Sequence, residues 1–456
     1  MRLPSWYGWL ADRWDALRTS YWFLPVQMAL AAGVLALVAI ELDRAFGPYL
    51  VEHIPWLTRT SAAGARSVLT TIAGSMMTVT SVVFSITIVA LTLTSSQFGP
   101  RLLRSFLRDR ASQLSLGTFV ATFFYSLLVL QAVGTPEQVP TLATALGVLL
   151  AGTSLFVLIF FIHHAASSIQ ASSVIAAVVR EIDAQLPQLF PESIGGGAGG
   201  PDATADVFSP GTELERIGLC VASDCEGYVR FLDEEALIAI ARECDVVIHL
   251  RTRPGRFVTQ GSELARVVPA ERMTPEAEEE LRAACILGDH RTATQDLGFL
   301  TGQLAEMAVR ALSPGVNDPK TAVDCVHRMG AVIAQLATRR MPSGLRTDED
   351  GALRVTVEPT RFDDLVAVCL DPVRRHGAND AQVVVALFEA IEMGARCCLD
   401  DERRGVLAEH AREIREGFMA ARRVESERDA ALVEAAFGHA MARVEGSGLP
   451  GEVTPG

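Results

Sequence analysis

Four long runs of sequence contain no Asp, Glu, Lys or Arg, and they constrain the fold more than any other feature. The runs cover 23–40, 67–96, 114–132 and 142–162. A helix needs about 20 mainly apolar residues to cross the hydrocarbon core of a bilayer, so the first run is marginal and the other three are long enough. The sequence therefore predicts a mainly α membrane protein with a four-span transmembrane domain over 1–165, in contact with membrane lipid.

The loops between these runs differ in their basic residues. The N-terminal segment carries three arginines and the second loop four; the first loop also carries three, which blurs the comparison, and the third loop, TPEQVP, has none. Loops rich in Arg or Lys stay in the cytoplasm, so we expect both termini and the long tail there. The eight cysteines all lie beyond residue 165 without CxxC spacing, which suits unpaired thiols in a reducing compartment.

Beyond residue 165 the charged residues return and the pattern changes. A helical extension leads into the Gly-rich stretch ESIGGGAGGPDATAD, which predicts an extension and flexible linker over 166–205. Short β-like runs predict a small β-rich domain over 206–270. The phrase GRFVTQGSELARV in this domain resembles the turn and strand of barrel-sandwich domains. No lysine stands at the tip, which excludes a swinging-arm carrier.

The rest of the tail is predicted to be a helical domain over 271–440. Capping and apolar spacing indicate helices over about 296–312, from Pro319 onward, over 381–398 and over 403–423. The final segment, 441–456, is expected to be disordered. The cytoplasmic tail is thus expected to be an α+β region with a barrel-like β segment followed by helices.

Several functional classes lack their sequence signatures. The net charge of −14 argues against a nucleic-acid binder, which needs a basic face. There is no GxxxxGK[ST], GxSxG or HExxH motif and no EF-hand loop. His163 and His164 are adjacent and point to different faces of a helix, and no other residues show zinc-ligand spacing. The sequence therefore predicts neither an enzyme nor a metal or cofactor site.

The second uncharged run contains hydroxyl residues at regular intervals. One series repeats every seven residues, and a second series, Ser67, Gly74, Ser81, Ile88 and Ser95, follows the same face of the helix. The opposite face is apolar. In the pore interpretation, the lining residues are Thr71, Thr78, Ser81, Ser85 and Thr92.

Two interpretations of this stripe remain open. Several copies of the helix could surround an axis, with hydroxyls facing water and a basic collar of Arg101, Arg104 and Arg108 at the cytoplasmic mouth. Alternatively, the small residues let helices approach closely, and the hydroxyls bond to carbonyls of the preceding turn. A stripe of 30 residues would be about 45 Å long, so the helix must tilt, break or project beyond the membrane.

The phrase LSPGVNDPKTAVDC predicts a turn between two helices. Asp318 is a good N-cap and Pro319 fits the first helical position. The free amides of this helix start could hold an anion or effector near Arg291, Ser313, Asn317, Asp318 and Thr321. The alternative is a capped interhelical turn that binds nothing.

Taken together, FSITIVALTLTSSQFGPRLLRSFLRDR, the GYV and GRFVTQG strands, GDHRTATQD and ALSPGVNDPKTA resemble the bacterial membrane proteins of domain of unknown function family 2254. The resemblance implies four spans and a cytoplasmic tail in a bacterial inner membrane, and it brings no established activity. The length and near-continuity of the hydroxyl stripe in 67–96, and not the resemblance, lead us to expect a homo-oligomeric channel for small ions with a regulatory tail. The alternative is a non-conducting scaffold or sensor whose tail binds a partner or a small ligand.

Overall fold

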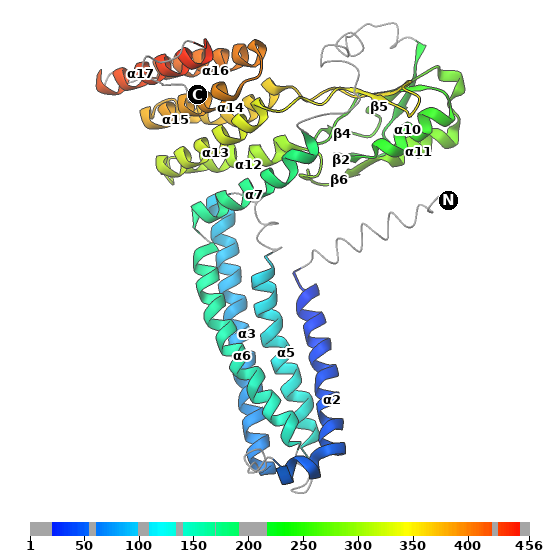
Figure 1. Ribbon diagram of the computed structural model, residues 1–456, viewed down its shortest axis with the longest axis vertical. Coiled ribbons are helices and arrows are strands. Elements are labelled where there is room, and N and C mark those ends of the chain that lie inside the picture. The colour runs from blue at the N-terminus through cyan, green and yellow to red at the C-terminus, as the bar shows by residue number, and fades with distance from the viewer. Residues whose placement is uncertain are drawn as a thin grey trace, which may run out of the picture. The chain divides into compact units, whose positions relative to one another are not determined.

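A computed structural model describes residues 21–53, 61–98, 109–133, 140–168, 170–190, 217–421 and 427–446. The chain divides into two compact units, Met1–Val174 and Ile175–Gly456. Figure 1 shows the helices and strands of both units with their labels.

Four long helices form the described part of the first unit. They are α2 (Phe23–His53), α3 (Ala62–Phe98), α5 (Arg110–Ala132) and α6 (Thr141–Ser168), and they run alongside one another (Figure 1). All four are long and apolar enough to cross a membrane, as the uncharged runs predicted. Helix α5 contacts each of the other three, and its side chains Phe119, Tyr125 and Val129 are fully buried.

Helix α3 continues without a break through the whole hydroxyl-rich run. Its apolar span, Ala62–Gln97, has 36 residues. At about 1.5 Å per residue it is roughly 54 Å long, well beyond a hydrocarbon core of about 30 Å. Because the structure describes Ala62–Phe98 as one unbroken helix, the break considered above does not occur within these residues. To fit a bilayer, the helix must tilt or project beyond the hydrocarbon core.

The second unit begins within α7 (Ala171–Leu189), whose Ile175, Val178, Ile182 and Leu186 are buried at helical spacing. Its strands are β1 (Leu219–Ala222), β2 (Gly227–Leu232), β3 (Val247–Leu250), β4 (Phe257–Val258), β5 (Glu263–Val268), β6 (Cys285–Gly288), β7 (Leu345–Thr347) and β8 (Leu353–Thr356). Helices α10 (Glu234–Glu243) and α11 (Pro275–Ala284), with the short 3₁₀ helix η4 (Ala270–Arg272), join them. Buried aliphatic side chains of strands and helices form one core there.

The expected barrel is not what these strands form. One sheet has five strands in the order β1-β5-β3-β8-β7, and the other has three in the order β4-β2-β6; both are open. The reason is tertiary pairing: β3 pairs in parallel with β8, and β2 pairs with β6, so strands from beyond 206–270 complete both sheets. The described tail is an α+β region without a closed sheet.

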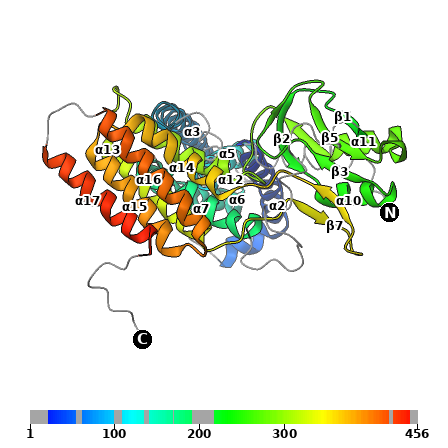
Figure 2. The same ribbon diagram turned by 90° about the horizontal axis from the view of Figure 1, so that it is seen from above.

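Helices fill the rest of the second unit. They are α12 (Leu297–Ala311), α13 (Pro319–Ala337), α14 (Phe362–Gly377), α15 (Ala381–Cys397), α16 (Asp401–Ala421) and α17 (Glu427–Val444). Figure 2 shows α13 to α17 as a group of neighbouring helices. Helix α17 continues past 441, where disorder was expected, and 447–456 lie outside the described residues. So does the predicted Gly-rich linker from 191 onward.

Candidate functional site

The hydroxyl stripe lies on the outer face of α3. Thr71, Thr78, Ser81, Ser85 and Thr92 are all exposed in the first unit. The opposite face turns toward the other helices, where Ile72, Val83 and Ala90 are buried. The structure thus places the five predicted residues on one continuous surface that faces away from the three neighbouring spans.

Most hydroxyls of this stripe already have an acceptor within their own helix. Thr71 donates to the Ser67 carbonyl at 2.8 Å, Thr78 to the Gly74 carbonyl at 3.1 Å, Ser81 to the Met77 carbonyl at 3.0 Å and Thr92 to the Ile88 carbonyl at 2.9 Å. A hydroxyl that donates to the preceding turn needs no water as an acceptor. Its oxygen still offers a lone pair, so the surface can face either a packed helix or water.

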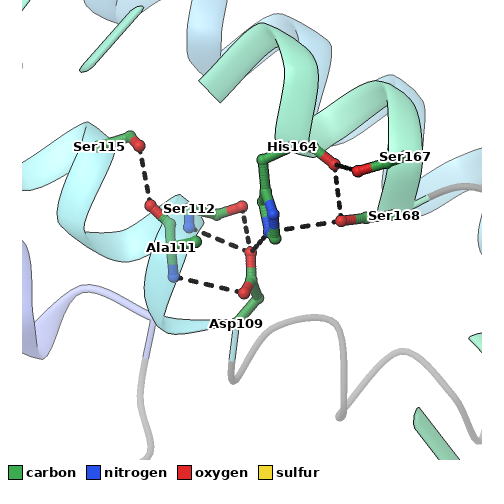
Figure 3. Close-up of polar contacts among 7 residues, drawn as sticks. All are labelled: Asp109, Ala111, Ser112, Ser115, His164, Ser167 and Ser168. Atoms are coloured by element: carbon green, nitrogen blue, oxygen red, sulfur yellow. Dashed lines mark hydrogen bonds and ion pairs between the residues drawn. The ribbon is translucent and has the colours of Figure 1, made fainter. Parts of the chain in front are cut away.

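The predicted basic collar, Arg101, Arg104 and Arg108, lies outside the described residues. The chain is described again from Asp109, which opens α5 and forms a polar cluster with α6 (Figure 3). Its carboxylate accepts from the backbone N–H of Ala111 at 3.3 Å and of Ser112 at 3.1 Å, and from the Ser112 hydroxyl at 2.6 Å. Asp109 is therefore the N-cap of α5.

The same carboxylate contacts α6. Oδ2 of Asp109 lies 2.8 Å from Nε2 of His164, and the Ser168 hydroxyl lies 3.3 Å from that nitrogen. Burial raises the pKa of Asp109, but hydrogen bonds from Ser112 and His164 outweigh this and hold the pKa below its ordinary value. Asp109 is thus a carboxylate that links two candidate spans. The sequence alone indicated no partner for His164. It did contain a signal for the cap, because Asp109 stands directly before a helical run with Ser112 in its first turn.

A second carboxylate caps α6 from a different helix. Asp43 of α2 accepts from the backbone N–H of Leu142 at 2.9 Å and of Ala143 at 2.7 Å. These amides belong to the first turn of α6, where no intrahelical acceptor exists. Side chains of α2 and α5 therefore hold the two ends of α6.

In the second unit, the turn between α12 and α13 has the predicted cap. Asp318 accepts from the backbone N–H of Thr321 at 3.2 Å and from its hydroxyl at 2.6 Å, and these bonds lower the pKa of Asp318. Ser313 donates to the Arg310 carbonyl at 2.7 Å, and Asn317 has a left-handed φ of 50°. Because a carboxylate already occupies the helix start, an anion there would meet like charge. The geometry favours the capped-turn interpretation.

Arg291 is not part of that turn. It pairs with Asp296 at 2.6 Å, immediately before α12, whereas Ser313 follows the other end of the same helix. Fifteen residues of helix separate them, about 22 Å at 1.5 Å per residue, so the structure does not bring Arg291 together with the other four predicted residues.

Arg291 and Asp296 instead line a cleft of about 1500 Å³ within the second unit. Gly255 lies against them with a left-handed φ of 84°, and a Cβ at this position would overlap the Asp296 carboxylate. Seven arginines and seven acidic residues line the cleft, so its walls carry no net charge and do not select an anion by charge. Sequence reasoning missed this cleft because its walls come from distant segments.

Comparison with known proteins identifies relatives over almost the whole chain. The family described as "Predicted membrane protein (DUF2254)" matches residues 18–393. Uncharacterized protein Rv1290c of Mycobacterium tuberculosis and uncharacterized protein Mb1321c of Mycobacterium bovis are each 30% identical over 457 residues, which covers 97% of this chain and 83% of the relative. No solved structure matches.

Proposed function

The chain belongs to the DUF2254 family of predicted membrane proteins, and from this premise we propose that it is an oligomeric channel for small ions in a bacterial inner membrane. Several copies of α3 would surround a common axis with their hydroxyl faces toward it. The second unit would act as the cytoplasmic regulatory part.

One observation supports the proposal above the others: the hydroxyl stripe is exposed on a helix whose opposite face is buried. Other exposed side chains of the first unit, such as Phe84 and Val89 of α3 and Phe156 of α6, are large and apolar and suit lipid. A surface rich in Ser and Thr suits water or another helix better than lipid. Symmetric association would place the stripes of all copies together.

The hydrogen bonds within α3 favour a second candidate, a non-conducting scaffold or sensor. Hydroxyls that donate to their own helix can pack against another copy without water. In this case the α3 stripe is a dry contact between copies, and the cleft of the second unit would bind the partner or small ligand.

Flux and mass together separate the two candidates. We would reconstitute the purified protein in liposomes, measure chloride and potassium flux, and determine its mass in detergent. Ser85→Leu changes the stripe; Thr153→Leu is the matched control, because Thr153 is an exposed hydroxyl on α6 that donates to the Leu149 carbonyl at 3.0 Å. The channel requires an oligomer with flux that Ser85→Leu abolishes and Thr153→Leu retains.

Other outcomes decide against it. An oligomer that passes neither ion excludes the channel and supports the scaffold, particularly if Ser85→Leu changes the mass. A monomer that passes no ion contradicts both candidates, because each places the stripe between copies.

A further inference from the structure

Helices α14 and α16 bring three potential metal ligands together in the second unit. Asp371 comes from α14, and His410 and Glu413 come from α16, where a spacing of three residues puts both side chains on one face. One ligand atom from each residue lies within 4.8 Å of the others. These helices pack against each other, so the group is held by two rigid elements.

His410 has a buried ring nitrogen without a partner. The residue is 7% exposed, and its Nε2 lies 3.1 Å from Oδ1 of Asp363. An ionised carboxylate can only accept, so Nε2 must carry the proton in that bond. In the neutral ring, Nδ1 is then a bare lone pair, and it makes no hydrogen bond.

The lone pair of Nδ1 faces another acceptor. Oδ1 of Asp371 lies 3.8 Å away, too far for a hydrogen bond even if Nδ1 were protonated. Two acceptors that face each other are stabilised by a cation between them. A metal ion bonded at about 2.1 Å to each atom would require the nitrogen and the oxygen to approach by only a few tenths of an ångström.

We propose that Asp371, His410 and Glu413 bind a divalent transition-metal ion of the zinc type. One imidazole nitrogen and two carboxylates form a donor set that suits Zn²⁺ or Mn²⁺ better than Mg²⁺, which prefers oxygen alone. Asp363 has the position of an outer-shell partner, because a metal-bound histidine characteristically donates its other N–H to a carboxylate. The expectation of no metal site, drawn from ligand spacing in the sequence, is replaced by this proposal.

Arg374 competes with the metal for the same oxygens. Its Nη2 lies 3.3 Å from Oδ1 of Asp371 and 3.0 Å from Oε2 of Glu413. Arg375 binds the other oxygen of Asp371 at 3.1 Å and can stay in place. Metal binding therefore requires the Arg374 guanidinium to move away, and its side chain is 22% exposed, which gives it access to solvent. The metal ion would thus replace the guanidinium as the cation beside Asp371 and Glu413.

The test measures metal stoichiometry and affinity in the full-length protein. The purified protein in detergent is stripped with a chelator and titrated with Zn²⁺ against a chromophoric competitor, and Co²⁺ replaces Zn²⁺ for absorption spectra. We expect one tight site whose affinity falls at least tenfold in Glu413→Gln and His410→Ala. Glu413 is 42% exposed, so its isosteric variant preserves the fold.

Two further variants make the test specific. Arg374→Met removes the competing guanidinium and is expected to tighten binding several-fold. His327→Ala is the matched control, because His327 pairs with Glu389 at 2.8 Å on a different surface of the helical part, and we expect no change. The proposal is overturned if the protein binds no stoichiometric metal, if Glu413→Gln binds as the unchanged protein does, or if Arg374→Met leaves the affinity unaltered. In any of those cases, Asp371, His410, Glu413 and Arg374 form an ion-pair network that binds no metal.

Discussion

Oδ2 of Asp109 lies 2.8 Å from Nε2 of His164, so the carboxylate that caps the start of α5 also holds the far end of α6. The two residues are 55 positions apart in sequence. One side chain thus satisfies free amides of one candidate span and fixes its neighbour beside it. Both side chains are about one quarter exposed, so solvent only partly screens the contact.

We expect Asp109→Ala to destabilise the first unit by about 1–2 kcal/mol through loss of the cap alone, with an additional loss from the contact with His164. His164→Ala should have a smaller effect, because the cap remains. Thermal unfolding in detergent of both variants and of the double variant measures the coupling between them. If the two single effects simply add, the 2.8 Å contact contributes nothing to stability.

Asp43→Ala tests the cap that α2 provides to α6. The substitution leaves the amides of Leu142 and Ala143 without their acceptor, and we expect a loss of about 1–2 kcal/mol. Glu41→Ala is the control, since Glu41 is a nearby acid, 67% exposed, that pairs only with Arg44 in the described structure. An exposed pair of this kind contributes less than about 1 kcal/mol. Equal unfolding midpoints for the two variants would contradict a capping role for Asp43.

The sequence predicted those parts of the fold that depend on neighbouring residues. Asp318 followed by Pro319 indicated the start of α13, and helices α12, α15 and α16 lie within a few residues of their expected bounds. The α3 pattern separated a polar face from an apolar one, and the apolar face is buried at Ile72, Val83 and Ala90. Periodicity and capping suffice for these features, because their causes lie within one or two helical turns.

The missed features all depend on residues far apart in the chain. The β3 strand pairs with β8 more than 100 positions later, which excludes the expected barrel, and Asp43 caps a helix about 100 positions away. The contact between His410 and Asp371 likewise requires the packing of α14 against α16. No local pattern encodes such pairings, because many partners with equal propensity compete for each strand edge or helix end. A single sequence therefore located the stripe and the Asp318 cap, but neither the cleft nor the polar contacts between residues far apart in the chain.

Gly330→Ala tests how closely α13 and α15 pack. A Cβ on Gly330 would lie 2.8 Å from Cα of Ala390 and 2.9 Å from its Cβ, and backbone cannot give way as a flexible side chain can. We expect a destabilisation of about 1–3 kcal/mol from overpacking. Gly405→Ala in α16 is the control: a Cβ there has nothing within 4 Å, and alanine should stabilise the helix by about 0.5–1 kcal/mol. Urea unfolding of the second unit measures both, and effects of the same sign would contradict the close approach.

His249 is expected to make the stability of the second unit depend on pH. Its ring is 6% exposed and lies 2.9 Å from the Thr356 hydroxyl. Burial, with repulsion from Arg251, lowers the pKa of His249 from 6.5 to about 4. Between these values the unfolded chain binds a proton that the folded protein does not bind, so the free energy of unfolding decreases as pH falls from about 6.5 to 4. The decrease is of the order of 3 kcal/mol at about 1.4 kcal/mol per pKa unit.

The variant His249→Gln separates this effect from other titrations. Glutamine does not titrate, so the stability of the variant should change less steeply between pH 6.5 and 4 than that of the unchanged protein, whatever its stability at neutral pH. Between about pH 7.5 and 8.5 the ring is neutral in both folded and unfolded states, and the two proteins should show parallel curves there. Urea unfolding at a series of pH values measures both slopes. Parallel curves across the acidic range as well would show that His249 is protonated equally in the folded and unfolded states, contrary to its burial beside Thr356.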